Sequence, residues 1–229
     1  RQRQMCIRDR LKEMFYIEHM DKNHKLLFHG AKSRIEGKLD IHKSRTNNDL
    51  GQGFYTGERY EQAISFISGF EKSSVYIFDF KEEGLKGKKY NVNQEWMMTI
   101  AYYRGALEEY ENHPIIKKLI EKSCDCDYII APIADNRMFQ IINSFIMGEI
   151  TDEQCKHCLA ATNLGYQYVF KSDKAIKSLK MLERCYISEK EKEYYKKMRN
   201  SDAKLGDDKV KLARIKYRGK GRYIDEILK

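Results

Sequence analysis

Proline is scarce in this sequence, with two residues in 229, and no apolar run approaches the eighteen residues that a membrane-spanning helix requires. These absences exclude a collagen-like, low-complexity or membrane-spanning protein. The hydrophobic content of 41% is typical of a packed domain and excludes a disordered chain. We therefore expect a soluble protein with one domain, or one domain and an appendage.

The first ten residues show neither an apolar period nor turn chemistry, and they have no hydrophobic core of signal-peptide length. They resemble translated adapter sequence from the edge of a metagenomic gene. We expect residues 1–10 to be non-native and coding sequence to begin near Leu11, with a short amphipathic lead-in helix. We also expect a cytoplasmic protein whose six cysteines are reduced thiols.

The net charge of +9 belongs to the ends of the chain. Residues 1–10 carry +3 and residues 186–229 carry +6, so residues 11–185 are neutral. The C-terminal part combines Lys and Arg with Tyr217 and Tyr223, a composition typical of an arm that contacts phosphates and stacks bases. The alternative is a solvated basic helical extension. We divide the chain into these three parts.

Apolar periodicity and turn signals predict strands and helices that follow each other irregularly, which indicates an α+β fold. The predicted strands are 25–29, 54–56, 74–80, 127–135 and 166–171, of which 127–135 is expected to be central and 166–171 to be the last. The predicted helices are one from Glu58 with Phe70 on its apolar face, 93–109 capped by Asn93, 114–122, 136–147, 152–161 capped by Thr151, and 173–182 capped by Asp173.

Two short segments predict a cleft for a nucleotide-like ligand. His29 and Gly30 end a strand, and the segment DLGQGFYT follows about twenty residues later. An imidazole with one nitrogen held by a neighbour can bind a ribose hydroxyl with the other. Glycines such as Gly53 allow close approach of a flat ligand, and the ring of Tyr55 can stack on a heterocycle. The alternatives are a satisfied core histidine and an ordinary turn.

The order of five sequence blocks is more specific than any single one. HGA, DLGQGFYTG, NQEW with Arg104, DYIIAPIADNR, and YQYVF before a Lys-Ala helix occur in this order over about residues 25–182. This order resembles the domain of unknown function family 3990, in the ADP-ribosyltransferase-like superfamily. The resemblance implies a split antiparallel sheet with surrounding helices, followed here by a C-terminal helical extension, and NAD as the substrate.

The resemblance also implies roles for individual residues. His29 would hold the adenine-side ribose of NAD, the backbone of Gly30 would bind the nicotinamide amide, and Tyr55 would stack on the nicotinamide ring. The third position, where such enzymes have Glu, is Gln167. A glutamine still binds a ribose hydroxyl but provides only a dipole where the transition state favours a charge. We therefore expect weak or substrate-assisted transfer, or NAD binding without turnover.

Other polar residues in these blocks have a functional and a structural interpretation. Glu95 is a substitute carboxylate, or an acid that complements the dipole of its helix. Asp135 either serves the site or caps the next helix. The resemblance implies a second acid where Asn136 stands.

The cysteines form a competing candidate site. Cys124 and Cys126 form one pair at a spacing that zinc sites use. Cys155 and Cys158 form a second such pair, with His157 between them. The second pair falls inside a predicted helix, so we expect packing as small hydrophobic residues and no metal.

We expect an NAD-dependent mono-ADP-ribosyltransferase-like protein that modifies a macromolecule, as in a bacterial toxin or a phage-conflict protein. One alternative is a catalytically silent nucleotide-binding or protein-interaction module of the same fold. Another is a nucleic-acid binder that acts through its basic C-terminal part.

Overall fold

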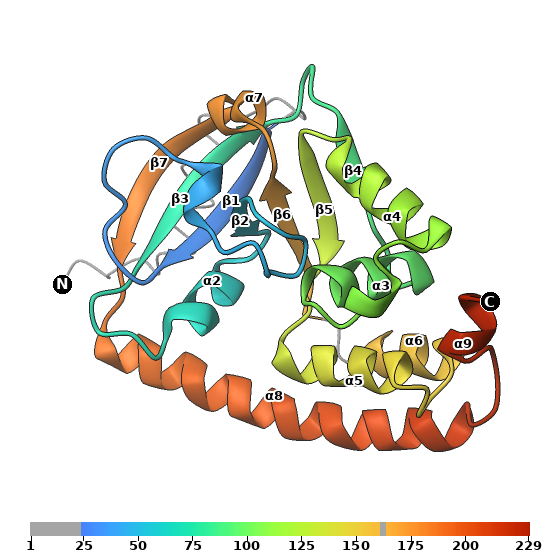
Figure 1. Ribbon diagram of the computed structural model, residues 1–229. Helices are drawn as coiled ribbons and strands as arrows, with labels where there is room; N and C mark the ends of the chain where they lie inside the picture. Colours follow the sequence, from blue (N-terminus) through green and yellow to red (C-terminus); the bar gives the residue numbers. More distant parts are fainter. Residues whose placement is uncertain (1–23, 161–163) are drawn as a thin grey trace.

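The computed structural model describes residues 24–160 and 164–229, which form a mixed α+β fold with one open sheet and helices around it (Figure 1). The strands are β1 (His24–Ala31), β2 (Phe54–Gly57), β3 (Ser74–Lys81), β4 (Gly87–Lys89), β5 (Tyr128–Pro132), β6 (Tyr166–Phe170) and β7 (Leu179–Tyr186). The helices are α2 (Tyr60–Ile67), α3 (Gln94–Tyr103), α4 (Pro114–Cys124), α5 (Asn136–Ile146), α6 (Asp152–Ala160), α7 (Asp173–Lys177), α8 (Glu189–Lys216) and α9 (Ile224–Ile227), with short 3-10 turns at η1 (Ile41–Lys43) and η2 (Glu108–Tyr110). The predicted lead-in helix and residues 1–10 lie outside the described residues.

The sheet has seven strands in the order β4-β5-β6-β2-β1-β3-β7, and every pairing is antiparallel except β4 with β5. β1 pairs with β3 along all 8 of its residues. In contrast, β1 and β2 meet in one registered pair, Phe28 opposite Gly57. We call this place the seam. It joins a three-stranded part, β1-β3-β7, to a four-stranded part, β4-β5-β6-β2.

The two faces of the sheet are covered differently. One face packs on α2 beside β1 and β3, and on α3, α5 and α6 beside β5 and β6. The other face is rich in aromatic side chains, among them Phe54, Phe78 and Phe170, and residues from the segment between β1 and β2 pack on it. Because side chains alternate along a strand, residues that are adjacent in sequence point to opposite faces of the sheet.

The predicted final strand is not the last one. β7 follows β6 and pairs with β3, and the helix predicted over 173–182 ends at Lys177. Its cap is Ser172, whose hydroxyl accepts from the backbone of Ala175, and not Asp173. Pairing with the otherwise open edge of β3 satisfies the backbone hydrogen-bonding groups of residues 179–186. The local sequence could not predict this pairing.

Two further helix boundaries differ from the prediction. α3 begins after Asn93, which caps it as predicted, but it ends at Tyr103 because Gly105 takes a left-handed conformation with φ of 81°. α2 begins at Tyr60, and Phe70 lies beyond its end and is 39% exposed.

The strand predicted to be central, β5, is buried throughout but lies next to the short edge strand β4.

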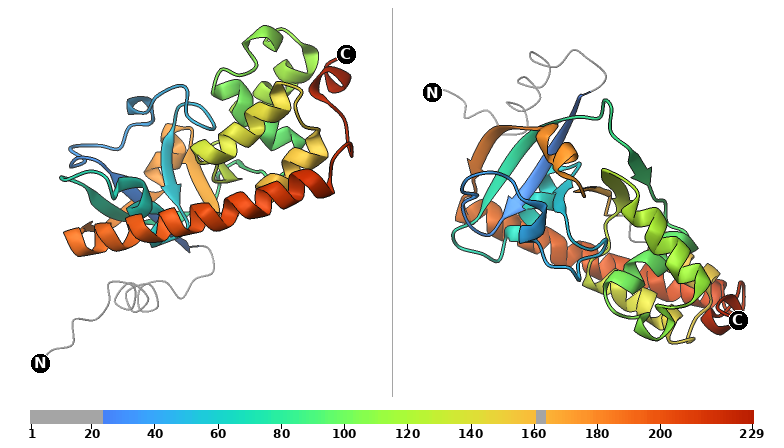
Figure 2. Two further views of the ribbon diagram at one scale, coloured as in Figure 1. Left: turned by 90° about the horizontal axis from the view of Figure 1, so that it is seen from below. Right: turned by 45° about the horizontal axis from the view of Figure 1, so that its top comes forward.

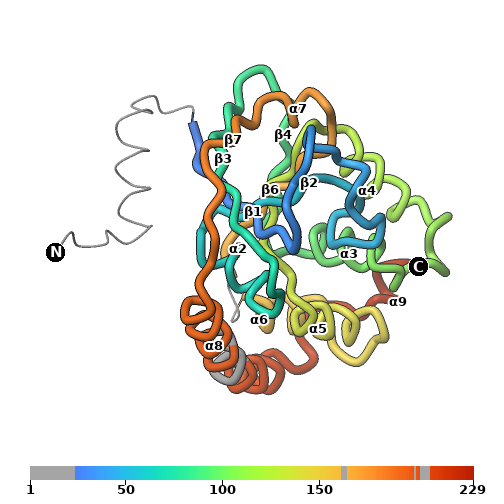
Figure 3. Tube along the Cα trace, turned by 90° about the vertical axis from the view of Figure 1, so that its left-hand side faces the viewer, coloured from blue at the N-terminus to red at the C-terminus, as the bar shows by residue number. Residues whose placement is uncertain are grey.

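The C-terminal residues pack against the rest of the molecule. α8 contacts α2 near its beginning and α6 farther along, so it runs beneath both parts of the sheet (Figures 1 and 2). Figure 3 shows the same helix nearly end-on, below α2 and α6. Ala213 and the apolar residues of α9 belong to the same core cluster as α3 and α5. No helix in the described part of the chain is both long and apolar enough to cross a membrane.

Candidate functional site

His29 lies on β1 beside the seam, and the protein fixes one of its ring nitrogens. Nδ1 is 2.6 Å from the carbonyl oxygen of Tyr55, and the ring stacks on Phe54 with centroids 4.5 Å apart. Since a carbonyl only accepts, Nδ1 carries the proton and donates it. Burial lowers the pKa of His29, so the ring is neutral at pH 7 and Nε2 is an acceptor.

Tyr55 lies on β2, and its hydroxyl holds the preceding turn. The hydroxyl donates to the carbonyl of Gly51 at 2.6 Å and accepts from the backbone N–H of Leu50 at 3.2 Å. Burial raises the pKa of this hydroxyl, which therefore stays protonated. The ring packs against the core on the helical face. Tyr55 thus has a structural role whether or not a ligand stacks on it.

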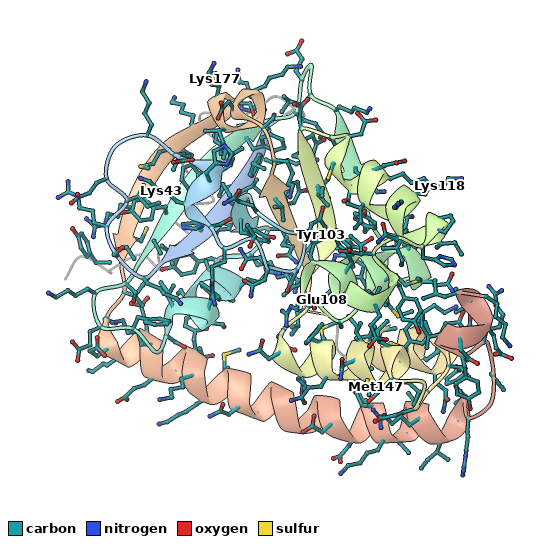
Figure 4. The ribbon with its side chains drawn as sticks, in the orientation of Figure 1. Lys43, Tyr103, Glu108, Lys118, Met147 and Lys177 are labelled. Atoms are coloured by element: carbon teal, nitrogen blue, oxygen red, sulfur yellow. The ribbon has the colours of Figure 1, made fainter. Side chains whose placement is uncertain are left out.

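The glycines of both predicted segments are required by contacts inside the protein. A Cβ on Gly53 would lie 2.7 Å from the carbonyl oxygen of Phe170, and one on Gly30 would collide with the backbone of α2. Gly51 has φ of 74°, and a Cβ there would lie 2.6 Å from the ring of Tyr103. Figure 4 shows Tyr103 near the centre of the molecule, on α3. These close approaches explain the glycines without a ligand.

Replacing Gly51 with Ala should lower the free energy of unfolding by about 2–5 kcal/mol, because left-handed strain of about 1–2 kcal/mol adds to overpacking of about 1–3 kcal/mol. Gly37→Ala is the matched control. Gly37 also has φ of 74°, but nothing lies within 4 Å of the added Cβ. Urea unfolding measures both. Equal losses would show that Tyr103 does not restrict this position.

Gln167 lies on β6, buried between Gly57 of β2 and Ala131 of β5. Its side-chain amide donates to the carbonyl of Pro132 at 3.3 Å and to Oδ2 of Asp49 at 3.4 Å. The residue that replaces the expected glutamate is therefore in contact with a carboxylate from another segment.

Asp49, which precedes β2, forms an ion pair with Arg104, which follows the end of α3. Oδ1 accepts from Nε of Arg104 at 2.8 Å and also from Nη2. The two side chains are only 12% and 17% exposed. Burial raises the pKa of Asp49, while the Arg104 guanidinium and the amide of Gln167 oppose that shift. A buried, hydrogen-bonded carboxylate therefore lies beside Gln167.

Arg104 connects this pair to the start of α5. Its guanidinium donates to the carbonyl of Ala134 at 3.0 Å and to the side chain of Asn136 at 3.4 Å, and it lies over the ring of Phe139. Asp135 caps α5 by accepting from the backbone N–H of Met138 at 2.8 Å, so the capping interpretation is confirmed. Asn136 belongs to the Arg104 contacts and provides an amide where the resemblance implies an acid.

The sheet register separates the predicted site residues. Tyr55 pairs with Val169, two residues from Gln167, so both side chains lie on the helical face. His29 lies between Leu27 and Ala31, which belong to the aromatic face. The structure therefore brings Gln167 together with Asp49 and Arg104, and places His29 across the seam from them, in contact with the backbone of Tyr55.

Glu95 does not belong to this group of residues. It lies in the first turn of α3 and pairs with Lys88 at 2.9 Å, whereas Arg104 follows the last turn of that helix. At 1.5 Å per residue the two positions are about 13 Å apart along the axis. The interpretation of Glu95 as an acid near the positive end of a helix dipole fits this position.

Lys171 is a residue that the sequence did not single out. Its ammonium donates to the carbonyls of Leu50 and Gln52, both at 2.7 Å, and burial lowers its pKa. Together with Tyr55 it fixes the turn that carries Asp49. Neither Lys171 nor the Asp49–Arg104 pair has a local sequence signal, because the partners are 55 to 121 residues apart.

Within residues 24–160 and 164–229, the structure brings together no group of three or more His, Cys, Asp and Glu side chains that could hold a metal ion. Cys155 and Cys158 are buried on α6, whereas Cys124 is exposed at the end of α4. His157 stacks on Tyr217 with ring centroids 3.6 Å apart. One ring face of Tyr217 is thus already covered.

Comparison with known proteins adds one finding. Residues 26–181 match the model of a family described as protein of unknown function, DUF3990. The chain belongs to this family. No curated protein and no solved structure matches it. The DUF3990 match begins in β1 and ends in β7, so it includes His29, Tyr55, Asp49, Arg104 and Gln167 and excludes α8 and α9.

Proposed function

We propose that this DUF3990 protein uses NAD as its substrate and transfers ADP-ribose to a macromolecular acceptor, on a fold of the ADP-ribosyltransferase type. The seam between β1 and β2 is the observation that carries this proposal. The short pairing of β1 with β2 supports the split sheet that the resemblance implies, and His29 lies beside this place.

His29 has the protonation state that the proposed role needs. Its Nδ1 proton is held by the Tyr55 carbonyl, and no described residue contacts Nε2 through a hydrogen bond. A ribose hydroxyl of NAD would donate to Nε2. The backbone of Gly30, the next residue on β1, would bind the nicotinamide amide, and the ring of Tyr55 would stack on nicotinamide.

In the proposed reaction the bond between C1′ of the ribose and the nicotinamide nitrogen breaks. Its electron pair leaves with nicotinamide, whose ring loses its positive charge, and C1′ shares a positive charge with the ring oxygen. An acceptor heteroatom then bonds to C1′ and loses its proton. A negative charge near C1′ lowers the barrier because positive charge develops there in the transition state.

The test is to incubate the full chain with NAD labelled on the adenylate. Nicotinamide release together with transfer of label to lysate macromolecules is the expected result. A cytoplasmic toxin or phage-conflict protein would label a few specific acceptors. The absence of both nicotinamide release and label transfer would contradict the proposed enzyme activity.

His29→Ala should abolish NAD binding, with at least a 100-fold rise in the Kd, because the ribose loses its acceptor. His42→Ala is the control, since His42 is an exposed histidine of η1. Isothermal titration calorimetry measures both Kd values. Unchanged affinity in His29→Ala would show that the binding site lies elsewhere.

A catalytically silent NAD-binding module is the second candidate. The observation that favours it is the pairing of Asp49 with Arg104, which neutralises the carboxylate that contacts Gln167. This candidate predicts thermal stabilisation by NAD with neither nicotinamide release nor label transfer.

Nucleic-acid contact by the C-terminal residues is the third candidate. Residues 209–222 contain seven Lys and Arg and no Asp or Glu. Lys216, Arg218 and Lys220 are exposed at the end of α8 and just after it. This concentration of exposed positive charge is the observation that favours phosphate contact.

A further inference from the structure

The substitution of glutamine at position 167 leaves the proposed reaction without its expected carboxylate. Gln167 itself is neutral, but its amide nitrogen lies 3.4 Å from Oδ2 of Asp49. The Arg104 guanidinium binds Oδ1, so both strong hydrogen bonds of the pair go to one oxygen. The hydrogen bond from Gln167 to Oδ2 is long, and the backbone N–H of Ala134 also binds this carboxylate. Because the two oxygens of a carboxylate offer about four acceptor positions, the Asp49 carboxylate retains capacity to accept another hydrogen bond.

The surroundings of Asp49 fix its carboxylate in place. Lys171 and the hydroxyl of Tyr55 hold the turn that carries it, through the carbonyls of Leu50, Gly51 and Gln52. Arg104 is held in turn by the carbonyl of Ala134 and by the ring of Phe139. Asp49 is therefore a preorganised carboxylate, because the surrounding hydrogen bonds hold it in position.

We propose that Asp49 is a catalytic residue that supplies the negative charge missing at position 167, and that Arg104 is its positioning residue. This inference rests on the proposed function. Oδ2 of Asp49 and the amide of Gln167 would together contact a hydroxyl of the nicotinamide ribose. As the bond from C1′ to nicotinamide breaks and its electrons leave with nicotinamide, Asp49 stabilises the positive charge on the ribose; it neither gains nor loses a proton.

A charge exchange between the two positions tests this role in the full chain. Asp49→Asn keeps the size and hydrogen-bonding capacity of the side chain but removes its charge. We expect nicotinamide release to fall at least 100-fold, as on loss of one preorganised electrostatic contact, with the NAD Kd unchanged within threefold.

The double variant Asp49→Asn with Gln167→Glu returns one carboxylate to the same pair of positions and restores the net charge around Arg104. We expect it to regain nicotinamide release to within tenfold of the wild type. A folded double variant that binds NAD but stays as slow as Asp49→Asn would overturn the proposal.

Asp49→Glu is the second variant, for the case in which Asp49→Asn does not fold. It keeps the charge and the Arg104 pair but moves the carboxylate by one methylene. We expect a tenfold or greater loss of nicotinamide release with the NAD Kd unchanged within threefold. Wild-type rates in this variant would overturn the proposal.

Comparison of the wild-type chain with the Asp49 variants separates this inference from the proposed function. Binding and turnover of NAD that do not depend on position 49 would leave the function intact and remove the role of Asp49. Binding without any turnover would overturn the proposed transferase activity, and the role of Asp49 with it, in favour of the silent NAD-binding module. Absence of NAD binding would overturn the proposed function, and this inference with it.

Discussion

Arg104→Ala should lower the free energy of unfolding by about 3–5 kcal/mol, because it leaves the carboxylate of Asp49 buried without its cation. Asp49 is 12% exposed, so water cannot replace the guanidinium. The variant also loses the hydrogen bond to Ala134 and the contact with Phe139. Denaturant unfolding followed by circular dichroism measures the loss, which is a large part of the total stability of a domain.

Lys211→Ala is the control for a surface ion pair. Lys211 and Asp208 are 3.8 Å apart on α8, with side chains 75% and 79% exposed. Such a pair contributes at most about 0.5 kcal/mol in most cases. If Arg104→Ala lost no more stability than Lys211→Ala, the Asp49–Arg104 pair would not be a structural element of the site.

Truncation after Tyr223 should largely unfold the protein. It removes Ile224, Ile227 and Leu228, which are 5%, 8% and 9% exposed within the core cluster of α3 and α5. At about 1.5–3 kcal/mol for each buried side chain, the loss is about 5–9 kcal/mol. The expected result is loss of the cooperative thermal transition.

Two exposed residues of the same region provide the control. Leu212 and Ile215 on α8 are 67% and 75% exposed, so replacing both with Ala should leave the melting temperature nearly unchanged. A truncated chain with a normal transition would show that α9 is dispensable. Nucleic-acid binding is therefore better tested by neutralising Lys216, Arg218 and Lys220, which leaves the core intact.

Elements with local signals could be predicted from the sequence. Asn93 caps α3, Pro114 begins α4, and Thr151 and Gln154 form a capping box before α6, as their residue types indicate. The apolar runs of β1 and β5 also lie where periodicity placed them. In each case the residues that determine the structure are within a few positions of each other.

Elements that depend on distant partners could not be predicted. β7 is a strand because β3 offers an open edge about a hundred residues earlier in the chain, and this pairing overrides the helical signal after Asp173. The packing of α9 had a usable signal, since Ile224, Ile227 and Leu228 have helical spacing. The basic residues around them favoured an interpretation as a solvated extension.

The candidate site divides in the same way. His29 and Tyr55 were identified from short motifs, whereas the contact between Gln167 and Asp49 spans 118 residues and required the fold. The structure also changes the interpretation of the glycines as ligand contacts. Gly51 lies against the ring of Tyr103, and Gly53 lies against β6. A motif can suggest a ligand where the protein itself supplies the contact.

Hydrogen–deuterium exchange of the full chain with and without NAD tests the central claim most directly. If NAD binds at the seam, amides of residues 29–31 and 49–56 should gain protection, while those of α8 should not change. Protection confined to α8, or none at saturating NAD, would contradict a nucleotide site at the seam.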